Sequence, residues 1–139
     1  MIRHTFVVLS FIAAAACGET GGHHHPDAAG SIDAAATTTI DETKVVGAAN
    51  FVEGKFTALH GDRILVQLNA TAPFDWNIHA HANGQTTTVV GARATMSARA
   101  DFVPAMDGEY FLIVVNQGPQ DLPVQVGMQI FGTTTWKWE

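Results

Sequence analysis

The feature that most constrains the fold is the strict alternation of apolar and polar residues from Phe74 to His81. A period of two is typical of a half-buried β-strand, because successive side chains point to opposite faces. The apolar set is Phe74, Trp76, Ile78 and Ala80, and the polar set is Asp75, Asn77, His79 and His81. We therefore expect a strand that anchors the core through Trp76 and presents both histidines on its other face.

The residues after this strand predict a β-hairpin. Asn83-Gly84 matches a two-residue type I′ turn, since Asn and Gly tolerate the positive φ angles that this turn requires. Gln85–Val90 should then pair antiparallel with Asp75–His81. Further strands are expected at 45–52, 55–59, 63–70, 95–103, 109–116, 124–130 and 133–138.

Turn residues and periodicity place these strands relative to the core. Gly54 should divide the first two candidates, and Pro73 should end the third because it cannot donate to a β-ladder. Glu109–Asn116 is apolar on both faces, so it should run through the middle of a sheet. The prediction is an all-β fold: a single antiparallel β-sandwich of the jelly-roll or Ig-like type, with seven or eight strands over residues 45–139.

The N-terminus has the features of an export signal. Arg3 precedes an apolar stretch over residues 5–12 and a run of alanines that ends at Cys17, the one cysteine in the sequence. Ala14-Ala15-Ala16-Cys17 resembles the lipobox of bacterial lipoproteins, although Ala14 stands where that pattern usually has Leu. The resemblance implies acylation of Cys17 and, because Gly18 is not Asp, an outer-membrane lipoprotein. The alternative is ordinary secretion after an Ala-x-Ala site.

This interpretation divides the chain into three parts: a signal peptide over residues 1–16, a low-complexity tether over 17–44, and a β-domain over 45–139. The formal charge is -6, and the seven Lys and Arg residues are scattered singly. Nucleic acid is therefore not an expected partner, because no basic patch is available to contact phosphates.

The polar residues raise two kinds of chemistry, catalysis and metal binding. No Ser or Cys stands in a nucleophile motif, and three of the four candidate aspartates sit at or beside turn signals, so we expect the protein not to be an enzyme. These four are Asp62, Asp75, Asp101 and Asp107. His79 and His81 lie two apart on one strand face, where two imidazoles can reach one Zn or Cu ion, and His60 is the candidate third ligand. The adjacent His23-His24-His25 could also bind such a metal, but they lie in the predicted tether, where we expect nothing to fix the geometry of the ligands.

Short motifs near the C-terminal half resemble a known family. Phe102-Val103-Pro104, Asp107-Gly108-Glu109-Tyr110 and Asn116 are similar to the GOLD-type β-sandwich of the emp24/gp25L/p24 proteins, and also to bacterial pre-peptidase C-terminal domains. The resemblance implies core roles for Gly108 and Tyr110 beside Trp76, and a non-catalytic module for binding or assembly.

The function expected from the sequence is a lipid-anchored envelope protein that binds another envelope protein or a polysaccharide. The alternative is a Zn- or Cu-binding envelope protein that uses His79 and His81.

Overall fold

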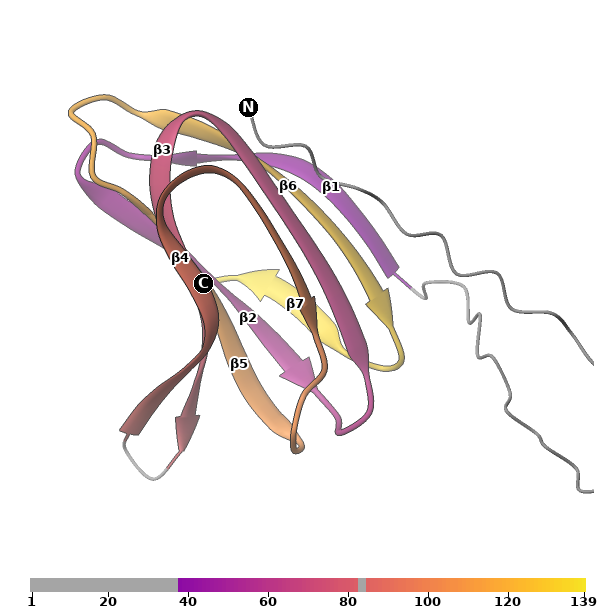
Figure 1. Cartoon of the computed structure of the whole chain (residues 1–139). Coiled ribbons are helices and arrows are strands. Elements are labelled where there is room, and N and C mark those ends of the chain that lie inside the picture. Colours follow the sequence, from indigo (N-terminus) through magenta and orange to yellow (C-terminus); the bar gives the residue numbers. More distant parts are fainter. Residues whose placement is uncertain (1–37, 83–84) are drawn as a thin grey trace, which may run out of the picture. The chain divides into compact units, whose positions relative to one another are not determined.

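The computed structural model describes residues 38–82 and 85–139, which form one antiparallel, curled sheet of seven strands (Figure 1). The predicted signal peptide, Cys17 and most of the predicted tether lie outside these residues. The described residues include no helix long and apolar enough to cross a bilayer. The strands are β1 (Thr38–Val46), β2 (Asn50–Ala58), β3 (Arg63–Ala82), β4 (Gln85–Phe102), β5 (Gly108–Asn116), β6 (Leu122–Phe131) and β7 (Thr135–Trp138).

The sheet has two halves that share the long strands β3 and β4. The strand order is β1-β6-β3-β5-β2-β7, with β4 paired to β3. Residues 63–70 of β3 pair with β6, whereas residues 75–80 pair with β5. β4 follows β3 on its other side through both halves. One half therefore consists of β1, β6 and the first part of β3, and the other of β7, β2, β5 and the second part of β3 (Figure 1).

The all-β fold class and the hairpin pairing are confirmed. Ala82 pairs with Gln85 and His81 with Thr86, the register that a two-residue connection requires. The expected break at Pro73 is wrong, because β3 is a single strand of 20 residues. Pro73 lies exposed within a register shift between Asn69 and Phe74, where the ladder is already interrupted and no donor is missed.

The core gathers apolar side chains from both halves of the sheet. Trp76 and Tyr110 are 5% and 4% exposed. The Tyr110 hydroxyl donates a hydrogen bond of 2.9 Å to the Met106 carbonyl, so its polar atom is satisfied. Gly108 does not belong to the core, since it is exposed and a Cβ there would meet nothing within 4 Å. The largest fully buried side chains are Phe56, Phe74, Ile64, Leu68, Ile78, Leu112, Met128 and Ile130.

Gly54 lies inside β2 and does not divide two strands, which corrects a second expectation. A Cβ at Gly54 would lie 1.9 Å from the Trp136 ring, so only glycine lets this indole pack across β2. The neighbouring Trp138 donates a hydrogen bond of 2.6 Å from Nε1 to Glu42 Oε1 on β1. Because β1 and β7 are the two ends of the sheet order, this contact joins the ends of the curled sheet.

The domain begins earlier in the chain than its composition indicated. β1 starts at Thr38 and pairs with β6 as far as Val46, so the C-terminal part of the expected 17–44 tether belongs to the sheet. The expected 45–52 strand is divided by a turn at residues 47–49, where Ala49 has a φ of 48°. Six of the nine β1 residues are exposed and none but Val46 is buried, which is why this strand resembled a linker in sequence.

Candidate functional site

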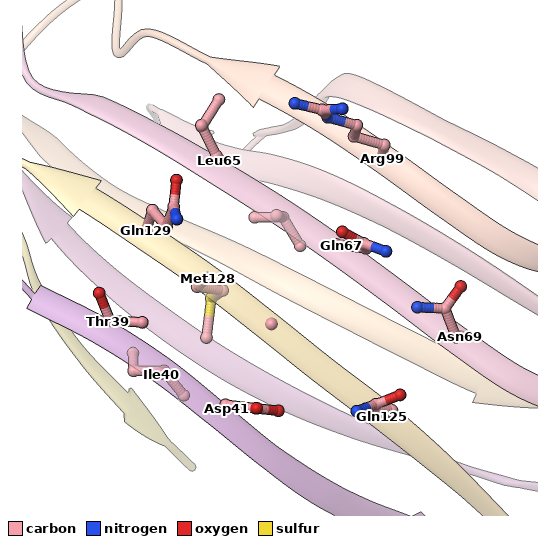
Figure 2. A pocket seen from close by; sticks show the side chains of 12 residues that line it. Thr39, Ile40, Asp41, Leu65, Gln67, Asn69, Arg99, Gln125, Met128 and Gln129 are labelled. Carbon is pink, nitrogen blue, oxygen red and sulfur yellow. The ribbon is translucent and has the colours of Figure 1, made fainter. Parts of the chain in front are cut away.

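A polar groove of about 410 Å³ lies on the outer face of the half formed by β1, β6, β3 and β4 (Figure 2). Four strands build it from residues that alternate with the buried core positions Ile64, Val66 and Leu68. The polar side chains that line it are Thr39 and Asp41 from β1, Gln125 and Gln129 from β6, Gln67 and Asn69 from β3, and Arg99 from β4.

The strand register places these side chains in rows across the sheet. Gly127 of β6 lies opposite Asp41 on one side and opposite Gln67 on the other. Gln67 in turn lies opposite Arg99 of β4. The central row therefore runs from Asp41 over Gly127 and Gln67 to Arg99, and Figure 2 shows Asp41 and Arg99 on opposite sides of the groove.

Gly127 forms the floor of the groove because it has no side chain to fill the space between Asp41 and Gln67, its neighbours on the adjacent strands. A Cβ built at this position would lie 3.9 Å from Gln67 Cβ, an ordinary van der Waals distance. Its backbone is therefore compatible with a side chain, and no close packing demands glycine here. The absent side chain leaves space for a ligand between Asp41 and Gln67.

Most polar side chains of the groove have no partner among the residues that the structure describes. Among residues 38–82 and 85–139, the side chains of Gln67, Gln125 and Gln129 form no hydrogen bond, and Asp41 and Arg99 form no ion pair. Asn69 alone is engaged, since its Oδ1 accepts a hydrogen bond of 2.8 Å from Ser97 Oγ. The groove thus presents amide donors and acceptors that remain available to a ligand.

The two charged ends of the central row have opposite sign. At the β4 end, Asp101 is adjacent to Arg99 but forms a bidentate pair with Arg63 at 2.8 and 2.5 Å. This pair holds the pKa of Asp101 below its usual value, first through the hydrogen bonds from Arg63. The Asp101 carboxylate pairs directly with Arg63, and Arg99 adds only a smaller electrostatic contribution to it. Among the described residues Arg99 forms no ion pair of its own, and it lies at the opposite end of the row from the Asp41 carboxylate.

The sequence-predicted histidines lie elsewhere, on the outer face of β2, β5 and β3. We call this surface the imidazole face; its centre is the cluster of His79, His81 and Phe111, and the polar residues around the cluster are Glu53, Lys55, Asn77, Thr86 and Glu109. The His79 ring stacks on Phe111 at 5.5 Å between centroids, and the His81 ring meets both at 5.0 and 4.9 Å. His79 is only 6% exposed, although its polar position in the alternating strand predicted an outward, solvated side chain.

Polar atoms on the imidazole face are bonded to one another. His79 Nδ1 shares a hydrogen bond of 2.8 Å with Asn77 Oδ1, and its Nε2 lies 3.5 Å from Glu53 Oε1. His81 Nδ1 shares one of 3.0 Å with Thr86 Oγ1. Burial lowers the pKa of His79 and His81 adds to this, while the Glu53 carboxylate offsets it only in part. His79 is therefore held as a neutral imidazole.

The described residues provide no third metal ligand beside His79 and His81. His60 lies in the turn between β2 and β3, where its backbone N–H donates to Asp107 Oδ1 at 2.7 Å. In the part of the chain that the structure describes, no three His, Cys, Asp or Glu side chains are placed to hold one ion. His79 and His81 remain a two-ligand pair, and the Zn or Cu site stays a hypothesis.

The groove residues were not singled out by the sequence. In the sequence, Gln125, Gly127 and Gln129 alternate with apolar residues, but the residues opposite them come from strands far apart in the chain. Gln67 and Asn69 alternate with apolar residues in the same way, and this pattern could have indicated the groove, although Leu65 interrupts it.

Comparison with known proteins supports the fold. No protein-family model matches the chain, and no curated protein matches it. Among solved structures, the Yersinia pseudotuberculosis-derived mitogen is similar with a TM-score of 0.54 and 7% identity, covering 69% of this chain and 88% of that one. Aeromonas hydrophila PliG, a periplasmic lysozyme inhibitor of g-type lysozyme, has a TM-score of 0.53 and 12% identity, covering 70% and 88%. Neither is a GOLD-type or pre-peptidase domain.

Proposed function

We propose that this protein is a non-catalytic binding protein of the bacterial cell envelope, anchored through a lipid on Cys17, that recognises a partner protein through the polar groove. The observation that carries the proposal is the set of unpaired amide and charged side chains around Gly127. Unpaired donors and acceptors on a rigid sheet give orientation and specificity to a bound partner.

Three further points support this function. The lining residues that the structure describes include no Ser, Cys or His, so the Thr39 hydroxyl and the Asp41 carboxylate have no imidazole base beside them in the groove. A similarly folded protein, PliG, is a periplasmic inhibitor of another protein. The N-terminal resemblance to a lipobox supports an envelope location, and a Cys17→Ser variant that still sediments with membranes would contradict the anchor.

The finer fold proposal is a β-sandwich in which the two halves of the curled sheet act as its layers. The groove and the imidazole face would then be the outer surfaces of the two layers. The GOLD-type family remains a prediction from short motifs, and the proposed function does not depend on it.

Photo-crosslinking in intact cells tests the proposed function. A benzophenone amino acid replaces Gln129 at the groove, and a matched variant carries it at Thr57, an exposed residue of β2. We expect a discrete protein adduct from position 129 and none from position 57, because only the groove contacts the partner. Equal adducts from both positions, or none from 129, would contradict the proposal.

A further inference from the structure

The charge arrangement of the groove restricts the chemistry of what it binds. The central row has a carboxylate at Asp41 and a guanidinium at Arg99, separated by Gly127 and Gln67. Three strand spacings separate the two ends, which is about 14 Å between backbones. A ligand that pairs with both ends carries a cation and an anion, and this backbone spacing sets the scale of the distance between them.

The residues in the middle of the groove favour a particular chemistry for the part of the ligand between its cation and its anion. Gln67, Gln125 and Gln129 each offer an amide oxygen and an amide nitrogen, and none is engaged within the described residues. A peptide backbone matches this set because it carries both N–H donors and C=O acceptors at regular intervals. Gly127 leaves room for the backbone to approach the sheet closely.

The groove lacks the features that would favour other ligands. Its lining contains no aromatic ring, so it offers no platform for stacking a sugar or a base. Arg99 is the one cation among its described lining residues and Asp41 balances its charge, so the groove offers no cluster of cations for phosphate. A groove with one charge of each sign at its ends and amide side chains between them is complementary to a zwitterionic peptide.

We propose that the groove binds an extended zwitterionic peptide segment across the strands, with its ammonium group at Asp41 and its carboxylate at Arg99. The inference rests on the proposed function and specifies which part of a partner is recognised. A chain of four extended residues spans about 13 to 14 Å, which matches the separation of the two ends. The charges can come from the free ends of a short peptide or from Lys and Glu side chains in a longer segment.

An NMR titration of the ¹⁵N-labelled full-length protein tests this inference, with tetra-alanine as the probe. We expect saturating shifts at the amides of Gln67, Gly127 and Arg99. N-terminal acetylation and C-terminal amidation should each weaken binding by about 1.5- to fivefold, the usual range for a solvent-exposed charge pair. No saturable shift at the groove, or a change below twofold on capping both ends, would overturn the inference.

Two conservative variants assign each charge to its partner. In Asp41→Asn, acetylation of the probe should no longer weaken binding, whereas amidation should still do so. In Arg99→Gln the pattern should be reversed. Gly108→Ala is the control, because it adds a methyl group in open space outside the groove. If acetylation weakens binding equally in Asp41→Asn and the unmodified protein, the assignment is wrong.

A second probe distinguishes the two sources of charge. N-acetyl-Lys-Ala-Ala-Glu-amide carries both charges on side chains and has no free ends. Tighter binding of this probe than of tetra-alanine indicates an internal segment, and weaker binding indicates free ends; both results retain the zwitterionic ligand. If a groove adduct forms in cells but neither probe binds, the proposed function stands and this inference fails.

Discussion

The two outer faces of the curled sheet differ in how many of their polar side chains are paired. On the imidazole face, His79 is bonded to Asn77 and lies beside Glu53, and Lys55 pairs with Glu109 at 2.7 Å. On the groove face, the pairs Arg63–Asp101 and Asn69–Ser97 lie along β3 and β4. The side chains of Gln67, Gln125 and Gln129 have no such partners among the described residues. A polar group that is paired within the protein contributes to folding, whereas an unpaired exposed group contributes little. The difference indicates that the first face stabilises the sheet and the second serves a ligand.

The largest effect on stability is expected on the imidazole face. His79→Ala should lower the free energy of unfolding by about 2 to 3 kcal/mol, because it removes a buried ring packed on Phe111 and leaves Asn77 without its partner. Urea unfolding followed by tryptophan fluorescence measures this change. A loss below 0.5 kcal/mol, the usual limit for surface positions, would mean that the two faces do not differ as described.

The pH dependence of stability should also come from the imidazole face. Burial lowers the pKa of folded His79, so the unfolded chain binds the proton more readily than the folded protein does. Stability from this residue is therefore complete above the unfolded pKa of about 6.5 and declines as the pH falls toward the folded pKa. Urea midpoints measured between pH 7.5 and 5 should decrease, and His79→Gln should reduce that slope. An unchanged slope in the variant would show that another group is responsible.

The smallest effect is expected on the groove face. Replacing Gln67, Gln125 and Gln129 together by Ala should change the free energy of unfolding by no more than about 0.5 kcal/mol per site, because these exposed amides have no partners to lose. Thermal unfolding of the triple variant provides the measurement. A loss as large as that of His79→Ala would show that the groove side chains are structural.

The sequence was most informative where a local pattern decides the structure. Alternation predicted the faces of the strand around Trp76, and Asn83-Gly84 predicted the pairing of His81 with Thr86. Gly54 and Pro73 were misleading, because their meaning depends on the ring of Trp136 and on a register shift in β3. The position of the Trp136 ring and the register shift in β3 are features of the tertiary structure, so the residues near Gly54 and Pro73 in sequence do not reveal them.

The groove could not be predicted because it depends on strand order. The central row forms only because β6 lies between β1 and β3 and because β4 follows β3 on its other side. This order brings together Asp41, Gly127, Gln67 and Arg99. The histidine pair, by contrast, was apparent at once because both residues belong to one strand. The expected exposure of His79 was wrong, because its ring stacks on Phe111 and is buried. The alternating pattern alone predicted a solvated side chain at this position.

The central claim is that the space above Gly127 is where the partner binds, and filling that space tests it most directly. Gly127→Gln places on the floor of the groove the same side chain that flanks it at Gln125 and Gln129, without close contact at the new Cβ. We expect the crosslinked adduct from position 129 to fall at least tenfold in this background and to be retained in the Gly108→Ala control, with both variants folded as judged by thermal unfolding. An undiminished adduct in a folded Gly127→Gln variant would contradict the account.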